Sequence, residues 1–173
     1  MIEFKDFSII SWNVRGFASK RSNRHMHELI SGYKLDLIFL YETHTNSAKS
    51  KMFWERESYM FIAIEEANGH SGGIWAMASL ACHAQFQVHM PQCITIKISR
   101  GSAFWHCSGV YASPTYSVRN NLWTFLGNLR ANITSSWIMI WDFNEILSPL
   151  EQRGGNFCST RAERFQLVFI IMI

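Results

Sequence analysis

Asp142 and Asn144 directly follow an apolar segment, residues 137–141, at a spacing that could form a polar site. Five uncharged apolar residues in a row are typical of a strand that is buried on both faces. Residues two apart in an extended chain point the same way, so this carboxylate and this amide would lie together at the carboxyl edge of a sheet. The pair could instead form a simple turn, because Asp and Asn side chains hydrogen-bond their own backbone. These residues alone leave both interpretations open.

Two other predicted strands also end in polar residues. The β-rich segment 7–12 precedes Asn13, and the apolar segment 35–41 precedes Glu42. Between them, apolar side chains recur every three or four residues from 23 to 33, which predicts an amphipathic helix. A strand, a helix and a second strand form a βαβ-like unit whose strands could be parallel. If these strands neighbour the one described above, their polar ends converge.

The remaining segments predict further strands and two more helices. Alternation of apolar and polar residues over 93–99 predicts a half-buried antiparallel strand. Asn23 and Ser117 are possible N-caps of the helices predicted at 23–33 and 117–133. The other predicted elements are strands at 59–64, 73–77 and 103–111 and a helix that could start within 160–167. No repeat, low-complexity segment or linker divides the chain, which therefore reads as one domain.

The composition is that of a folded domain of modest charge. Hydrophobic residues make up 48% of the 173 residues and charged residues 17%, which supports a sizeable core and argues against disorder. A net charge of +3 does not by itself indicate nucleic-acid binding. Residues 14–24 nevertheless contain Arg15, Lys20, Arg21 and Arg24 without one acid, which suits a loop that faces phosphates. A solvated loop would explain the same pattern.

Cysteine usage and the lack of a secretory signal predict an intracellular protein with reduced, buried thiols. The four cysteines are widely spaced and form no Cys-x-x-Cys motif. A zinc site built from Cys82-His83 and His106-Cys107 is not favoured, because adjacent residues of a strand face opposite sides. The apolar run 167–173 is far shorter than the roughly 20 residues that a membrane span requires. We therefore expect no membrane association.

Six short motifs occur in the order in which one known family carries them. They are Ser11–Gly16, Leu40–Thr43, Ser71–Ile74, Val110–Pro114, Asp142–Ile146, and Glu151–Gly155 ahead of Arg161–Phe165. With these motifs the chain resembles the endonuclease/exonuclease/phosphatase superfamily, and most closely the endonuclease domain of plant LINE-type (non-LTR) retrotransposons. The resemblance covers about residues 7–167.

The resemblance implies an α/β (α+β) fold, a four-layer sandwich of two mainly antiparallel β-sheets flanked by helices, with the site at an edge that the sheets share. The family carries a further strand and a Ser-Asp-His signature. We therefore expect residues 1–173 to form a single domain that is incomplete at the C-terminus and lacks roughly its C-terminal third. Members hydrolyse phosphodiesters or phosphomonoesters with Mg²⁺, and the retrotransposon branch nicks DNA at its target site.

The resemblance also implies roles for five residues at predicted strand ends. Glu42 and Asn13 match residues at the metal, Mg²⁺ or possibly Mn²⁺, and such hard ions prefer oxygen ligands. Tyr111 and Asn144 match groups that hydrogen-bond the scissile phosphate. Asp142 matches the carboxylate that orients or deprotonates the attacking water. Because these matches occur together, they favour a site over a simple turn.

DNA is the partner that the resemblance implies. Arg15, Lys20 and Arg21 are expected to contact its phosphates, and no obligate protein partner is predicted. The expected location is intracellular, and nuclear if the ancestral role persists.

Two departures from the family lower the expected activity. Trp141 replaces the Gly that precedes Asp-x-Asn in many members, so its bulk could displace Asp142 or block substrate. The Asp and His of the C-terminal signature are missing, and loss of one member of a catalytic unit commonly removes most of its rate. We expect a truncated copy with weak or no activity. The alternatives are a non-catalytic nucleic-acid-binding remnant and the product of a degenerate open reading frame.

Overall fold

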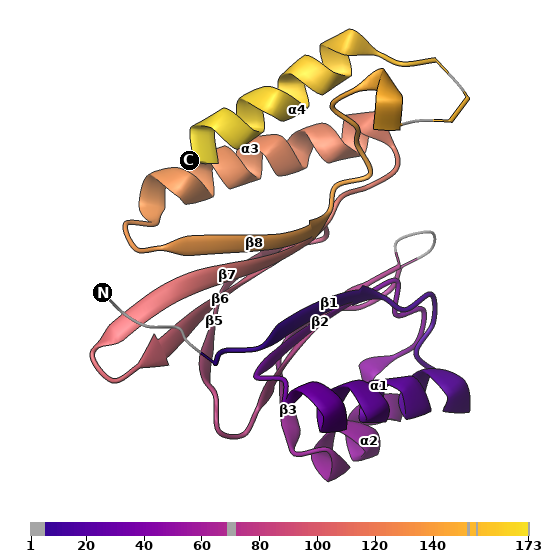
Figure 1. Cartoon of the computed structure of the whole chain (residues 1–173), viewed down its shortest axis with the longest axis vertical. Coiled ribbons are helices and arrows are strands. Elements are labelled where there is room, and N and C mark those ends of the chain that lie inside the picture. Colours follow the sequence, from indigo (N-terminus) through magenta and orange to yellow (C-terminus); the bar gives the residue numbers. More distant parts are fainter. Residues whose placement is uncertain (1–5, 69–71, 152, 155, 173) are drawn as a thin grey trace.

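The chain is arranged in four layers, with two β-sheets packed face to face and helices on both outer faces (Figure 1). A computed structural model describes residues 6–68, 72–151, 153–154 and 156–172, with side chains as far as Leu167. This architecture confirms the expected four-layer α+β sandwich. Residue 71 of one sequence motif and residues 152 and 155 of another lie outside the described residues, as do the side chains of the closing run from 168.

The first sheet comes from the first half of the chain. Its strands are β1 (Ile9–Asn13), β2 (Leu37–Tyr41), β3 (Tyr59–Glu65) and β4 (Ile74–Ser79), in the order β1-β2-β4-β3. β1 and β2 are parallel, as the βαβ-like pattern allowed, and the other pairings are antiparallel. The outer face is covered by α1 (Lys20–Tyr33), the 3₁₀ turn η1 (Ser47–Ser50) and α2 (Lys51–Arg56).

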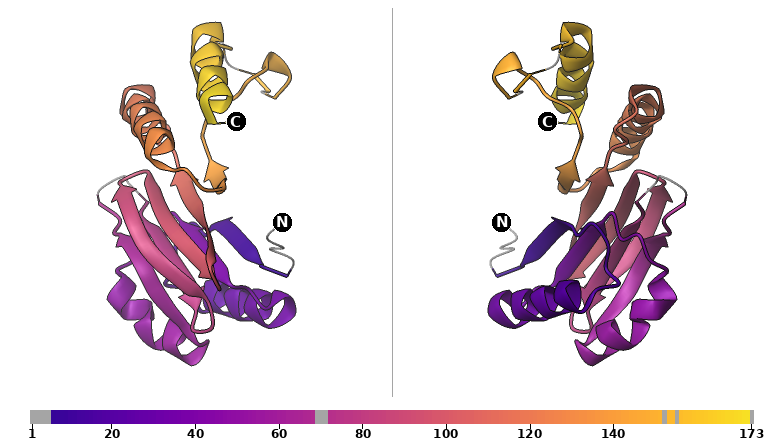
Figure 2. Two further views of the ribbon diagram at one scale, coloured as in Figure 1. Left: turned by 90° about the vertical axis from the view of Figure 1, so that its left-hand side faces the viewer. Right: turned by 90° about the vertical axis from the view of Figure 1, so that its right-hand side faces the viewer.

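The second sheet comes from the second half of the chain. Its strands are β5 (His83–Met90), β6 (Cys93–Arg100), β7 (Ala103–Tyr111) and β8 (Trp137–Asp142), in the order β5-β6-β7-β8. Only the pairing of β7 with β8 is parallel in this sheet. Its outer face carries α3 (Tyr116–Asn132) and α4 (Ser159–Met172), and the short 3₁₀ turn η2 (Pro149–Glu151) lies between β8 and α4. Figure 2 shows the edge strands β1 and β8 on the same side of the sandwich.

The core between the sheets explains why β2 is apolar throughout. Leu37, Phe39 and Tyr41 pack against the second sheet, whereas Ile38 and Leu40 pack under α1 and α2. All five side chains are buried, as expected for a strand covered on both faces.

Gly109 of β7 allows the two sheets to approach each other at this point. A Cβ atom at position 109 would lie 2.2 Å from Cδ1 of Phe39 in β2, far inside van der Waals contact. A side chain is therefore excluded there by the ring of the opposite sheet.

Three local predictions were wrong. α1 begins at Lys20 and its N-cap is Ser19, whose hydroxyl accepts a hydrogen bond from the Ser22 amide, so Asn23 lies inside the helix. The N-cap residue of α3 is Thr115, and not Ser117. β6 is buried on both faces, because α3 covers the side on which Thr95 lies.

The cysteine prediction holds in part. Cys93 and Cys107 are buried and Cys82 is half-buried, but Cys158 is exposed, and the four thiols are free. Burial raises the pKa of the Cys93 thiol to about 12, which keeps it protonated and unreactive. Within the described ranges, no helix is long and apolar enough to cross a membrane.

Candidate active site

The predicted site residues follow strands that end at the same end of the sandwich. β1 runs parallel to β2, β7 runs parallel to β8, and both pairs end on the right in Figure 1. Asn13 is the last residue of β1, and Glu42 directly follows β2. Tyr111 and Asp142 are the last residues of β7 and β8 and are opposite each other in the strand register. The topology therefore brings four of the five residues to one edge.

Glu42 is the centre of this group. Its Oε1 atom accepts hydrogen bonds from Asn13 Nδ2 at 2.9 Å and from the Tyr111 hydroxyl at 2.6 Å. The hydrogen bond from Tyr111 is the largest effect that lowers the pKa of Glu42. The hydrogen bond from Asn13 and the charges of His44 and Arg15 act in the same direction, against the opposing effect of burial. The carboxylate is thus held ionised and in one orientation.

The backbone around Glu42 adopts an unusual conformation. Glu42 and His44 have φ values of 52° and 46°, in the left-handed region that residues other than glycine rarely occupy. Gly72 packs directly against Glu42, since a Cβ atom at position 72 would lie 2.6 Å from the Glu42 Cα. The Glu42 amide also donates to the carbonyl of Gly73 at 3.1 Å. The glycine motif of the sequence therefore supports the loop that carries the carboxylate.

Tyr111 links the two halves of the site. Burial raises the pKa of its hydroxyl, and the neighbouring charges of Glu42 and Asp142 raise it further, so the group remains a hydrogen-bond donor. Its ring stacks on Tyr41 at a centroid distance of 5.8 Å, and the Tyr41 hydroxyl donates to the Ile140 carbonyl at 2.9 Å. These contacts fix β2 against β7 and β8 next to the site.

Asp142 and Asn144 form a turn and also face the site. The Asn144 amide donates to Oδ1 of Asp142 at 3.2 Å, as the turn interpretation predicts. The Asn144 side chain contacts the residue that follows β7, where its Nδ2 donates to the Ala112 carbonyl at 2.8 Å. Asn144 has a φ of 46°, so this turn also contains a left-handed residue. The two interpretations of the sequence are therefore compatible.

Trp141 and Asp142 lie on opposite faces of β8. The side chains of Trp137 and Met139 pack against the layer of α3 and α4, whereas Ile140 faces the other sheet. Because strand residues alternate, Trp141 faces the helices and Asp142 the opposite side. The Trp141 ring stacks on Phe143 at 5.1 Å. The Trp141 side chain nevertheless lines the same open hollow as Asp142 and Asn144.

The basic residues near the site are exposed, but they do not form one loop. Arg15 follows β1 with a φ of 47°, whereas Lys20 and Arg21 belong to the first turn of α1. Arg24 lies one turn further along and pairs with Glu28 at 2.9 Å. The first turn of α1 contains no acid, although acidic residues are the ones that stabilise a helix N-terminus.

The oxygen atoms at Glu42 fit a hard divalent cation. Oδ1 of Asn13 is buried without a hydrogen-bond partner, next to the carboxylate that its own Nδ2 contacts. An unpaired buried oxygen is costly and suits a metal ion or an ordered water. The number of metal-binding side chains is small, however. The described part of the chain gathers no group of three or more His, Cys, Asp or Glu side chains that could hold a metal. The zinc pairs considered for the sequence do not assemble either.

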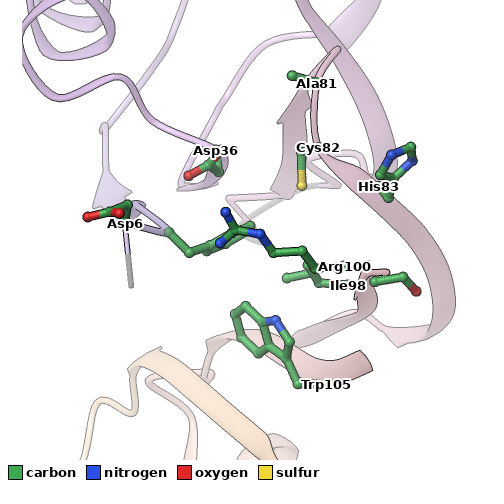
Figure 3. Close-up of a pocket in the computed structure, with 10 residues that line it drawn as sticks. Asp6, Asp36, Ala81, Cys82, His83, Ile98, Arg100 and Trp105 are labelled. Atoms are coloured by element: carbon green, nitrogen blue, oxygen red, sulfur yellow. The ribbon is translucent and has the colours of Figure 1, made fainter. Parts of the chain in front are cut away.

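A separate hollow of about 180 Å³ lies at the opposite end of the sandwich (Figure 3). Asp6, Asp36, Cys82, Arg100 and Trp105 are among the residues that line it, and Arg100 extends across it from β6. None of the residues predicted for the site contributes to this hollow.

Comparison with known proteins identifies the family. The model of the endonuclease/exonuclease/phosphatase family matches residues 10–162. The chain belongs to this family. No curated protein sequence matches the chain.

Several solved structures that are similar in fold to this chain are nucleases. An AP endonuclease from Archaeoglobus fulgidus is 14% identical and gives a TM-score of 0.74 over 95% of this chain and 70% of its own. The AP endonuclease LMAP from Leishmania major is 14% identical, with a TM-score of 0.69 over 96% of this chain and 66% of its own. The endonuclease domain of TRAS1, a telomere-specific non-LTR retrotransposon, is 10% identical, with a TM-score of 0.69 over 96% of this chain and 70% of its own.

The TM-scores of 0.69–0.74 show that these structures share the fold of this chain. The chain spans 66–70% of the length of the three structures.

Proposed function

We propose that the chain is a retrotransposon-type DNA endonuclease domain that hydrolyses phosphodiesters at target sites with Mg²⁺ or Mn²⁺. The observation that supports this best is the convergence of Asn13 and Tyr111 on the Glu42 carboxylate, beside an unpaired amide oxygen. The fold similarity to two AP endonucleases and to a retrotransposon endonuclease domain supports the choice of DNA as substrate. A DNA-nicking role would require access to the nucleus.

Glu42 and Asn13 would hold the metal ion. Oε1 of Glu42 already accepts two hydrogen bonds, which leaves Oε2 and the Asn13 Oδ1 atom as the oxygen ligands. When bound, a divalent ion neutralises charge on the phosphate and on the leaving oxygen. Tyr111 holds the carboxylate in this orientation through its hydrogen bond to Oε1.

Asp142 and Asn144 would act on the other side of the phosphate. Asp142 would take the proton of the attacking water, as a carboxylate within reach of that water can do. The Asn144 side-chain amide donates to the Ala112 carbonyl and also contacts the Tyr111 hydroxyl, so it would donate to a phosphate oxygen in place of that second contact. Tyr111 remains protonated, but its one hydroxyl proton is donated to Glu42, so it would donate to a phosphate oxygen only in exchange for that hydrogen bond.

Basic residues beside the site would hold the DNA backbone. Arg15 is close enough to lower the pKa of Glu42, and the exposed Lys20 and Arg21 follow at the start of α1. Phosphate contacts by such residues supply sequence-independent affinity that falls as salt rises.

A nicking assay on supercoiled DNA tests the function. We propose that residues 1–173 nick weakly or not at all, because the described residues gather no group of three or more His, Cys, Asp or Glu side chains for a metal and catalytic groups act non-additively. Fusing the C-terminal segment of a family member should produce nicking that needs Mg²⁺ or Mn²⁺ and is abolished by Glu42→Ala. Glu55→Ala, at an exposed acid of α2, is the matched control and should nick normally.

Strong nicking by residues 1–173 that Glu42→Ala abolishes would contradict the weak activity and retain the assignment. Nicking that survives Glu42→Ala in the fused protein would refute the assignment itself.

A non-catalytic nucleic-acid-binding protein is the second candidate. The observation that favours it is the first turn of α1, where Lys20 and Arg21 are exposed and no acid is present. This candidate predicts salt-sensitive DNA binding without nicking, and neutralising Arg15, Lys20 and Arg21 to Gln should weaken the binding. Lys49→Gln and Lys51→Gln, outside this region, give the control. Unchanged binding after the triple substitution removes this candidate.

A further inference from the structure

Glu145, directly after Asn144, is a buried carboxylate held by two arginines. Its side chain is 3% exposed. Oε2 accepts a hydrogen bond from Arg119 NH2 at 2.7 Å, and Oε1 accepts one from Arg161 NH2 at 2.9 Å. Arg161 Nε also donates to Oε2 at 3.2 Å, so this arginine binds the carboxylate through two nitrogens. Glu145 and Arg161 lie in two of the sequence motifs, but their pairing was not predicted, because the members of the group are 16 or more residues apart in the chain.

The two arginines come from both helices of the outer layer. Arg119 belongs to the second turn of α3 and is fully buried, and Arg161 belongs to the first turn of α4. Both guanidinium groups lie near the Tyr116 ring, at 5.8 and 5.4 Å from its centroid. Glu145 therefore joins α3, α4 and the loop after β8 at one point.

Arg119 also hydrogen-bonds the segment to which the Asn144 side chain is bonded. Its NH1 donates to the Ser113 carbonyl, and the carbonyl of the preceding residue, Ala112, accepts the hydrogen bond from Asn144 Nδ2. One guanidinium thus holds the residue after Asn144 on one side and the strand end that Asn144 contacts on the other. The residues that follow the donor, Asn144, and the acceptor, Ala112, are therefore both bonded to the same side chain.

Burying these charges is an expensive way to obtain stability alone. Desolvation of a buried ion pair can exceed its attraction, and apolar replacements of similar volume are often as stable. Such a group instead fixes the orientation of the segments that carry it, because a planar guanidinium binds a carboxylate in a defined geometry. A fixed orientation is needed here, because Asn144 has a left-handed φ of 46° that the surrounding contacts must maintain.

We propose that Glu145 is a positioning residue, which through Arg119 and Arg161 holds the Asn144 side chain at the edge where Tyr111 and Asp142 end. The proposal rests on the proposed function for its catalytic meaning, but its geometry can be measured without substrate or metal. The competing explanation is that the group only packs α4 against α3. The two explanations differ in their prediction for the Asn144 side-chain amide: it changes on loss of the Glu145 carboxylate only if Glu145 positions it.

The test follows the side-chain amide of Asn144 by ¹⁵N NMR in residues 1–173. In Glu145→Gln, the two arginines lose their carboxylate, so the Asn144 amide protons should exchange with solvent about tenfold faster or more and move toward the shifts of exposed amides. Arg161→Gln, at the partly exposed member of the group, should do the same to a smaller extent. This second variant keeps the test valid if Glu145→Gln folds poorly.

Arg164→Gln is the matched control. Arg164 is an arginine of the same helix that also links α4 to Tyr116, at 2.8 Å from its hydroxyl, but it does not contact Glu145. Its loss should leave the Asn144 amide unchanged. The proposal is overturned if Asn144 keeps its native signals in Glu145→Gln, or if Arg164→Gln releases it equally. Either result is independent of whether the chain ever nicks DNA.

Discussion

At the scale of single residues, the hydrogen bond from Tyr111 to Glu42 favours the ionised form of the proposed metal ligand. It is the largest effect that lowers the pKa of Glu42 from 4.5, so Tyr111→Phe should raise that pKa. Because the pKa of Glu42 is lower in the folded chain, the stabilisation is present above pH 4.5 and is lost as the pH falls through the folded pKa. The stability difference between wild type and Tyr111→Phe should therefore shrink in acid. A ¹³C NMR titration of the Glu42 carboxyl, with urea melts at several pH values, measures both.

Tyr33→Phe, at an exposed tyrosine at the end of α1, is the control and should leave the Glu42 titration unchanged. If Tyr111→Phe also leaves it unchanged, the 2.6 Å hydrogen bond does not hold Glu42 in solution.

The sequence predicted which residues of the site would meet, but not how they bond. Asn13, Glu42 and Tyr111 were found because each ends an apolar segment and matches a family motif. That Asn13 and Tyr111 share one carboxylate oxygen depends on the register between two sheets, which no local pattern contains. Glu145 was missed for the same reason, since its partners are 26 and 16 residues away.

At the scale of elements, the contact of β7 with β2 limits what position 109 can hold. In Gly109→Ala, the new methyl would overlap the Phe39 ring, and forcing it into the core should cost about 1–3 kcal/mol of unfolding free energy. Gly127→Ala is a contrasting control, because Gly127 lies within α3 with open space around its Cα. It should gain about 0.5–1 kcal/mol from helix propensity. Urea midpoints of the two variants should move in opposite directions, and equal shifts would contradict the close packing.

Elements with a strong local pattern were predicted, and those without one were missed. β2 and β8 were found as uninterrupted apolar segments. β5 was not assigned, because it is an edge strand whose side chains alternate between exposed and partly buried without a clear hydrophobic period. α2 has six residues, too few to show a helical repeat. The cover of α3 over Thr95 is a tertiary contact, so β6 looked only half-buried in the sequence.

At the scale of the whole molecule, one core joins the two sheets, so the chain should unfold as a unit. The core between the sheets combines Phe39 of β2 with Ile96 of β6, both fully buried. Ile96→Ala should cost about 2–5 kcal/mol, although the change lies in the second sheet only. Hydrogen exchange of the slowest amides should then accelerate by about thirtyfold or more in both β2 and β6. Leu150→Ala, at a side chain that is 96% exposed, should change neither. Acceleration confined to β6 would mean that the sheets unfold separately, as expected for the product of a degenerate reading frame and not for a selected endonuclease fold.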